Sequence, residues 1–264
     1  MLTSETIRLK SGRSWHVYSG GTGPTLIWLH GLTGINASDL VVAALERKHR
    51  IVAPLAPGFT DLAELDEIGN IHELALDYDD LLDHLGLEGV AIAGHSFGAM
   101  IAAEIAAHFP RRAKQLVLLA PVGLWNEAYP GRDVFAEPFT EVESFLWHDK
   151  EAREALAARR SNEAGPSSQA EQIIAVAQSL TAVAKFVWPI PEKGLKKRLP
   201  RVAASALAVF GAEDSFISPR YAEDFSRGLR RLQTAVIAGA GHMLPYERTE
   251  EVVGLIERFL AVPS

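Results

Sequence analysis

The chain of 264 residues contains no cysteine. This absence excludes disulfide bonds, thiolate metal ligands and cysteine nucleophiles, and it agrees with a reducing compartment. No apolar run approaches the roughly 18 residues that cross a membrane. The segment Met1–Thr6 also lacks the basic start and the apolar stretch of a secretion signal. We therefore expect a cytoplasmic protein with no membrane partner.

An excess of positive charge is lacking as well. The formal net charge is −7, whereas the phosphates of nucleic acids select for a basic protein surface. We therefore expect no nucleic-acid partner. Hydrophobic residues make up 48% of the chain and charged residues 22%, which is typical of a folded globular protein. The length fits one α/β domain with an insertion better than two separate domains.

Short apolar runs alternate with helical patterns along most of the chain. The expected strands are residues 6–10, 14–18, 26–30, 50–53, 90–93, 115–120, 206–210 and 234–238. The first two are separated by Ser11-Gly12 and predict a hairpin. The others are separated by helical patterns, which predicts a parallel sheet with helices on both faces.

The alternation of strands and helices lapses between residues 125 and 191. Capping patterns that begin at Thr140 and Ser168, and the segment 151–160, predict helices there. We interpret 125–191 as an inserted helical cap over the cleft, and 1–124 with 192–264 as the core. Aromatic residues are frequent in the cap. Trp125, Trp147 and Trp188 are candidates to line an apolar substrate pocket, with packing inside the cap as the alternative for each.

The segment Gly94-His95-Ser96-Phe97-Gly98 lies between an apolar run and an alanine-rich helical pattern. A serine on so tight a turn has a strained backbone, and Gly94 and Gly98 lack the bulk that would prevent close packing. Such a turn lifts the hydroxyl above the sheet edge beside the positive end of a helix. This is typical of a nucleophile, and the alternative is a glycine-rich turn with an incidental serine.

Polar residues also follow two late strands. Asp214 comes after strand 206–210, with Glu213 as an alternative acid, and His242 comes after strand 234–238. A histidine activates a serine hydroxyl when a carboxylate fixes its orientation. The chain order Ser96, Asp214, His242, each after a strand, is the order expected for one fold in particular.

The loop His30-Gly31-Leu32 follows the predicted strand 26–30. A glycine-rich loop after a central strand directs backbone NH groups into the cleft, so we expect half of an oxyanion hole here. His30 itself we interpret as structural, because it can order the loop by hydrogen bonding.

Together these motifs resemble the α/β-hydrolase family, in its branch with a serine nucleophile and a helical cap. The resemblance implies a mostly parallel eight-stranded sheet with helices on both faces. It implies that Ser96 is the nucleophile, His242 the general base and Asp214 the orienting acid. Backbone NH groups of Leu32 and Phe97 would form the oxyanion hole, supported by His30, Gly31, Gly94 and Gly98. No cofactor and no metal would be needed.

One departure concerns the rim of the cleft. After Pro57-Gly58-Phe59 many members of the family carry a glycine, where this chain has Thr60 and Asp61. The dehalogenase and epoxide-hydrolase branches of this fold use an aspartate nucleophile, whereas the resemblance places Ser96 at that position. The chain therefore differs from these two branches.

The expected reaction is therefore acyl transfer to water through an acyl-enzyme. A carboxylesterase for small to medium apolar esters comes first, with a lactonase, thioesterase or amidase as alternatives. A carbon-carbon bond hydrolase of the meta-cleavage-product type would need a cap residue to position a carboxylate, for which Arg132, Arg153 and Lys185 are candidates. A ligand-binding protein on the same fold is the non-enzymatic alternative.

One predicted helix, which ends before Gly86, carries His72 and His84 together with several acidic residues. We interpret these side chains as a solvated face, because neither histidine has a partner at metal-ligand spacing. No metal site is expected from the sequence.

Overall fold

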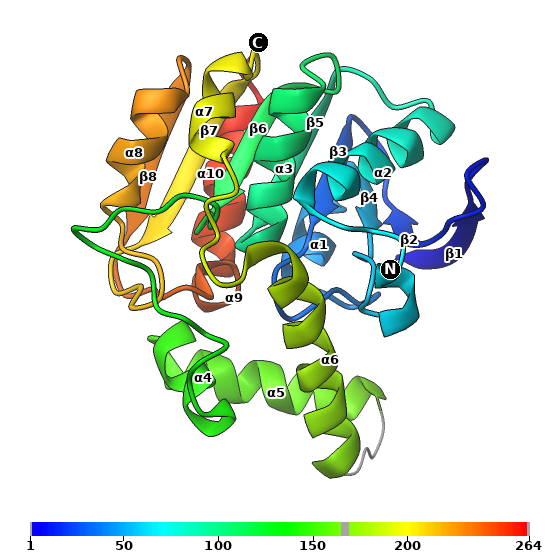
Figure 1. The fold of residues 1–264 in the computed structure, drawn as a ribbon. Helices are drawn as coiled ribbons and strands as arrows, with labels where there is room; N and C mark the ends of the chain where they lie inside the picture. Colours follow the sequence, from blue (N-terminus) through cyan, green and yellow to red (C-terminus); the bar gives the residue numbers. More distant parts are fainter. Residues whose placement is uncertain (1, 165–168, 263–264) are drawn as a thin grey trace.

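An eight-stranded sheet runs through the computed structural model, which describes residues 2–164 and 169–262 (Figure 1). Its strands, in chain order, are β1 (Thr3–Arg8), β2 (Ser14–Gly20), β3 (Thr25–Leu29), β4 (Arg50–Pro54), β5 (Val90–His95), β6 (Ala113–Leu119), β7 (Ser205–Gly211) and β8 (Leu232–Ile237). They lie in the order β1-β2-β4-β3-β5-β6-β7-β8. Only β2 runs antiparallel to its neighbours, β1 and β4. The predicted mostly parallel sheet, with its opening hairpin, is confirmed.

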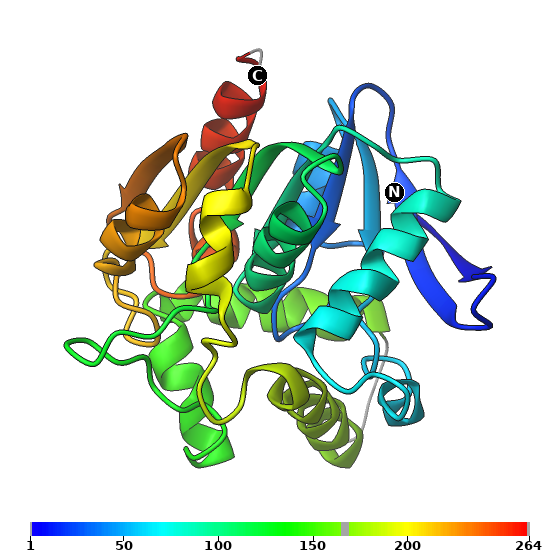
Figure 2. The same cartoon turned by 45° about the horizontal axis from the view of Figure 1, so that its top comes forward.

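Helices cover both faces of this sheet (Figures 1 and 2). The helices of the core are α1 (Leu40–Leu45), α2 (Ile71–His84), α3 (Phe97–His108), α7 (Leu195–Arg198), α8 (Tyr221–Gly228), α9 (Leu244–Glu247) and α10 (Thr249–Leu260), with the 3₁₀ turns η1 (Leu62–Leu65) and η2 (Leu199–Arg201). Side chains of α2, α3, α7 and α8 share one apolar core, and those of α1, α9 and α10 share another.

The sheet separates these two cores because neighbouring side chains on a strand point to opposite faces. On β5, Ile92 belongs to the first core, whereas Ala91 and Ala93 belong to the second. All three are buried. A strand that is buried on both faces has a continuous apolar sequence, and this is why β5 could be predicted from the sequence.

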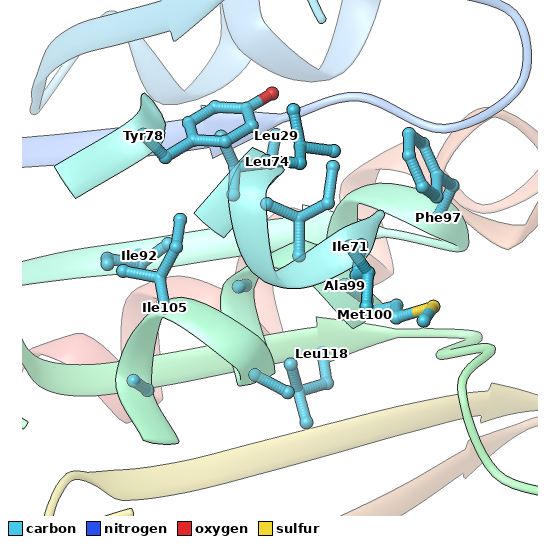
Figure 3. Close-up of a cluster of buried hydrophobic side chains, with 14 of the residues drawn as sticks. Leu29, Ile71, Leu74, Tyr78, Ile92, Phe97, Ala99, Met100, Ile105 and Leu118 are labelled. Atoms are coloured by element: carbon cyan, nitrogen blue, oxygen red, sulfur yellow. The ribbon is translucent and has the colours of Figure 1, made fainter. Parts of the chain in front are cut away.

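The first core holds α2 and α3 against the sheet. Figure 3 shows Leu74 and Tyr78 of α2 gathered with Ile105 of α3 and Ile92 of β5. Each of these side chains is at most 1% exposed. The packing fixes α3, and therefore the turn that precedes it, against the sheet.

Three helices lie together at one end of the sheet: α4 (Phe139–Leu146), α5 (Lys150–Ala164) and α6 (Gln169–Val187) (Figure 1). They form the predicted helical insertion. The division of the chain at residues 125 and 191 stays a prediction.

Residues 126–138, at the start of the insertion, contain no helix. The buried carboxylate of Asp224 on α8 holds this segment instead. Its oxygens accept hydrogen bonds from Asn126 Nδ2, at 3.3 and 3.1 Å, and from the hydroxyl of Tyr129. A buried carboxylate requires such partners, and they fix the segment in an irregular path.

None of the helices among the described residues is long and apolar enough to cross a membrane.

The chain changes direction across the sheet between β3 and β5, which are adjacent. From β3 it continues through α1 to β4, on one side, and from β5 through α3 to β6, on the other. In open α/β sheets such a switch point forms a crevice at the carboxyl ends of the strands. The residues that directly follow β3 and β5 are His30 and Ser96.

Candidate active site

Ser96 occupies a strained turn between β5 and α3. Its backbone has φ 54° and ψ −113°, a region that residues with side chains rarely adopt. The Ser96 amide donates a 2.8 Å hydrogen bond to the carbonyl of Leu119 on the neighbouring strand. A Cβ at Gly98 would lie 2.1 Å from the Leu29 carbonyl oxygen, and one at Gly94 would lie 2.3 Å from that of Gly98. The turn therefore requires glycine on both sides of Ser96.

His242 connects this serine to a carboxylate. Its Nδ1 lies 2.9 Å from Asp214 Oδ2, and its Nε2 lies 2.8 Å from Ser96 Oγ. An ionised carboxylate can only accept, so Nδ1 carries the proton and the Nε2 lone pair faces the serine hydroxyl. All three residues are buried. The arrangement can accept the hydroxyl proton at Nε2.

The second oxygen of Asp214 is held by the backbone. Asp214 Oδ1 accepts hydrogen bonds from the amides of Phe216, at 2.9 Å, and Ile217, at 2.8 Å. Neighbouring Glu213 is exposed, and its carboxylate accepts a 3.1 Å hydrogen bond from the amide of Ala240. Of the two acids that the sequence offers, Asp214 is the one beside His242.

His30 orders the loop after β3. Its Nε2 accepts a 2.9 Å hydrogen bond from the amide of Ala56, so Nδ1 must carry the proton that it donates to the Gly31 carbonyl at 2.8 Å. Burial lowers the pKa of His30 to about 4, which keeps the ring neutral near pH 7. A Cβ at Gly31 would lie 3.2 Å from Ser96 Cβ, so this loop passes close to the serine.

His95 is a site residue that the sequence reasoning missed. Its Nε2 donates a 2.9 Å hydrogen bond to the backbone carbonyl of His242. Burial lowers the pKa of His95 to about 3, and the nearby His242 disfavours its charged form further. The neutral ring therefore holds the backbone of the loop that carries His242. The motif Gly-x-Ser-x-Gly does not specify the residue at His95, so it gave no signal for this role.

Glu247 on α9 was also missed, and it joins the His242 loop to the insertion. One carboxylate oxygen accepts from the amide of Gly241 at 3.0 Å. The other accepts from the amides of His148, at 3.0 Å, and Asp149, at 2.8 Å. Burial raises the pKa of Glu247, and these three amide donors oppose that shift.

An apolar cavity opens beside Ser96 and His242, between the sheet and the insertion. Leu32 and Phe97, the two predicted oxyanion-hole residues, both line it. The other residues on its wall are His95, Val122, Leu124, Trp125, Gly131, Arg132, Asp133, Val134, Phe135, Leu146, Val183, Val187, Pro189, Pro191, Phe216, Ile217 and Met243.

Of the three tryptophans predicted for this pocket, only Trp125 lines it. Trp188 follows the end of α6, is 55% exposed, and is not among the residues that line the cavity. Trp147 packs near the ring of Tyr246, with ring centroids 6.4 Å apart. The prediction was wrong for both because sequence does not show which side of the insertion faces the cleft.

Of the three cationic residues that could position a substrate carboxylate, one lines the cavity and two do not. Arg132 lines the cavity, where its guanidinium lies over the ring of Phe145 at 5.1 Å from the centroid. Arg153 forms ion pairs with glutamates 143 and 154. Lys185 donates a 2.6 Å hydrogen bond to the carbonyl of Leu65. Arg132 is therefore the one of the three that could meet a bound molecule.

Comparison with known proteins relates the chain to hydrolases. A model described as the alpha/beta hydrolase family matches residues 26–255. A dihydrolipoyllysine-residue acetyltransferase component of an acetoin cleaving system from Pseudomonas putida is 27% identical over 244 residues, 90% of this chain and 64% of that protein. The chain thus spans less than two thirds of that relative's length. A 2-hydroxymuconate semialdehyde hydrolase from Pseudomonas sp. (strain CF600) is 25% identical over 272 residues, 96% of this chain and 92% of that protein.

Solved structures share the fold. The crystal structure of naproxen esterase, a carboxylesterase from Bacillus subtilis, superposes with a TM-score of 0.71 over 98% of this chain and 92% of that chain. The two sequences are 19% identical, so this likeness concerns the fold alone.

Proposed function

Because this chain belongs to the alpha/beta hydrolase family, we propose that it is a serine hydrolase, and specifically a carboxylesterase for small to medium apolar esters. The observation that carries the proposal is the continuous hydrogen-bonded chain from Ser96 through His242 to Asp214. Ser96, at one end of this chain, lies on the wall of an apolar cavity. A serine hydroxyl is a poor nucleophile unless a base removes its proton, and this geometry supplies the base.

In the first half of the proposed reaction, Ser96 Oγ attacks the ester carbonyl carbon and its proton moves to His242 Nε2. Asp214 stabilises the imidazolium that forms. The carbonyl oxygen becomes an oxyanion, to which the amides of Leu32 and Phe97 donate. One donor of this kind typically lowers the barrier by about 3 kcal/mol. Collapse of the intermediate breaks the ester bond, and the leaving alcohol takes the proton from His242.

In the second half, water replaces the alcohol. His242 removes a proton from the water, whose oxygen attacks the acyl-enzyme carbonyl. The acid product leaves, and Ser96 recovers its proton from His242. The cycle releases one alcohol and one acid for each ester and water consumed, and its steps need no cofactor.

The substrate class follows from the wall of the cavity. Valine, leucine and phenylalanine side chains surround Ser96, and the charged side chains on the wall are Arg132 and Asp133. Such a wall favours apolar acyl or alcohol groups, with orientation left to a few polar atoms.

Replacement of the serine tests the proposal. Ser96→Ala should reduce turnover of a short-chain p-nitrophenyl ester by about 10⁴-fold or more, because the nucleophile is lost. The matched control is Ser226→Ala, which removes an exposed hydroxyl on α8 that bonds the carbonyl of Ala222.

Ester turnover that survives in Ser96→Ala would contradict the proposal. If the unaltered chain binds esters and releases no product, the ligand-binding alternative is favoured instead.

A second candidate function, carbon-carbon bond hydrolysis, rests on Arg132. Its guanidinium lies on the cavity wall, where it could position the carboxylate of a vinylogous diketone. The similarity to 2-hydroxymuconate semialdehyde hydrolase also supports this second candidate function. The serine chemistry would be shared, so substrate preference has to separate the two functions.

Parallel assays of a neutral ester and a carboxylate-bearing vinylogous diketone make this separation. For the second candidate, Arg132→Met should lower kcat/KM on the diketone by about 10- to 100-fold relative to the ester, because a charged hydrogen bond is lost. For the carboxylesterase, the unaltered chain should prefer the ester, and Arg132→Met should change the ratio little.

A further inference from the structure

Three side chains with metal-ligating atoms meet near the C-terminal end of α3, at the end of this helix away from Ser96. His72 lies in the first turn of α2, and Glu104 and His108 lie one turn apart on α3. Residues four apart on a helix share a face, so both α3 side chains can point toward α2. The sequence did not predict this meeting, because His72 and His108 are 36 residues apart.

The distances between these atoms suit a small cation. His72 Nδ1 lies 3.2 Å from His108 Nε2, and His108 Nε2 lies 3.6 Å from Glu104 Oε2. All three ligand atoms lie within 4.8 Å of one another. Two nitrogens bound tetrahedrally to Zn²⁺ at 2.0 to 2.1 Å would be about 3.3 Å apart. The two rings are therefore already at the spacing of two zinc ligands.

Glu104 is held in place by Arg198. The glutamate side chain has no exposed surface, and Arg198 donates from Nε to Oε2 at 2.8 Å and from Nη2 to Oε1 at 2.6 Å. A carboxylate oxygen can accept a hydrogen bond and still bind a metal ion, and partners of this kind orient the ligands of metal sites.

His108 is the last residue of α3, where the negative end of the helix dipole favours a cation.

We propose that His72, Glu104 and His108 bind Zn²⁺ and thereby join α2 to α3. Two imidazoles and one carboxylate are a donor set that zinc prefers, and one tetrahedral position remains for water. The cluster lies at the opposite end of a helix about 18 Å long from Ser96. The ion would therefore stabilise the packing of α3 and take no part in the reaction at Ser96.

Zinc titration of the chain without an affinity tag, after treatment with a chelator, tests this site. Isothermal titration calorimetry should give one Zn²⁺ per chain. At a hundredfold excess of free Zn²⁺ over Kd, the midpoint of thermal unfolding should rise by roughly 5 to 10 °C. Loss of a residue that only hydrogen-bonds a metal ligand typically weakens metal binding by about 10- to 100-fold. His72→Ala and His108→Ala each remove a ligand itself, so each should weaken Zn²⁺ binding by more than this.

The matched control is His84→Ala, an exposed histidine on the same helix α2. This variant should bind Zn²⁺ as the unaltered chain does. Circular dichroism melts in chelator show that each variant is folded before zinc is added. The proposal is overturned if the unaltered chain binds no stoichiometric Zn²⁺, or if His72→Ala and His108→Ala bind it as tightly as His84→Ala.

Discussion

At the scale of single residues, the buried imidazoles around Ser96 have separate tasks that their hydrogen bonds define. His242 bonds both Asp214 and Ser96, whereas His30 bonds only backbone atoms of its own loop and of Ala56. His95 bonds the carbonyl of His242. We therefore regard His95 as a positioning residue, which acts through the backbone of its neighbour.

Removal of this bond should affect turnover more than binding. His95→Ala should lower kcat for the p-nitrophenyl ester by about fivefold, since one neutral hydrogen bond contributes about 1 kcal/mol. KM should change less than kcat, because His242 would be displaced while the apolar side chains of the cavity wall would remain. His95→Gln, whose amide can still donate, should recover part of kcat.

Steady-state kinetics of the three proteins check this role. A purely structural role for His95 would give the same kcat in folded His95→Ala as in the unaltered chain. It would also remove any difference between His95→Ala and His95→Gln.

At the scale of elements, the turn from β5 to α3 depends on close approach of two backbones. The serine motif predicted that turn, because glycine on both sides of a serine between an apolar run and a helical pattern has a steric meaning. The structure adds the partner of Gly98, the Leu29 carbonyl on β3, which sequence alone could not identify.

Gly98→Ala should therefore destabilise the protein by more than about 4 kcal/mol, because the new methyl group would overlap a backbone carbonyl. The contrasting variant is Gly254→Ala in α10, where a Cβ would meet only the flexible tip of Arg258 at 3.2 Å. Alanine should raise stability there by up to about 1 kcal/mol.

Urea unfolding midpoints and soluble yield measure both changes. Equal midpoints for Gly98→Ala and the unaltered chain would show that the turn from β5 to α3 does not need this glycine.

The insertion shows where prediction at this scale ends. Its helices α4, α5 and α6 lie where local sequence patterns predict helices. The path of residues 126–138 does not follow, because the carboxylate of Asp224, almost 100 residues further along, fixes it through Asn126 and Tyr129. The position of Trp147 has the same origin, since its ring packs near Tyr246 of the distant helix α9.

At the scale of the whole molecule, the fold brings together three side chains from three different strand ends. Ser96 and His242 are 146 residues apart in sequence, and their side chains lie 2.8 Å apart. The order of the motifs predicted that they share one edge of the sheet. Neither the hydrogen-bond distances nor the help of His95 and Glu247 could be predicted, because these depend on how loops from several strands pack together.

Activation of Ser96 by His242 can be tested by peptide mapping by mass spectrometry after reaction with a serine-modifying p-nitrophenyl phosphonate. If Ser96 is the nucleophile and His242 activates it, we expect one phosphonyl adduct, on the peptide that contains Ser96. The adduct should form with loss of ester turnover and be absent in His242→Ala. Full loss of ester turnover with the adduct on another residue, or an equal rate of labelling in His242→Ala, would contradict this expectation.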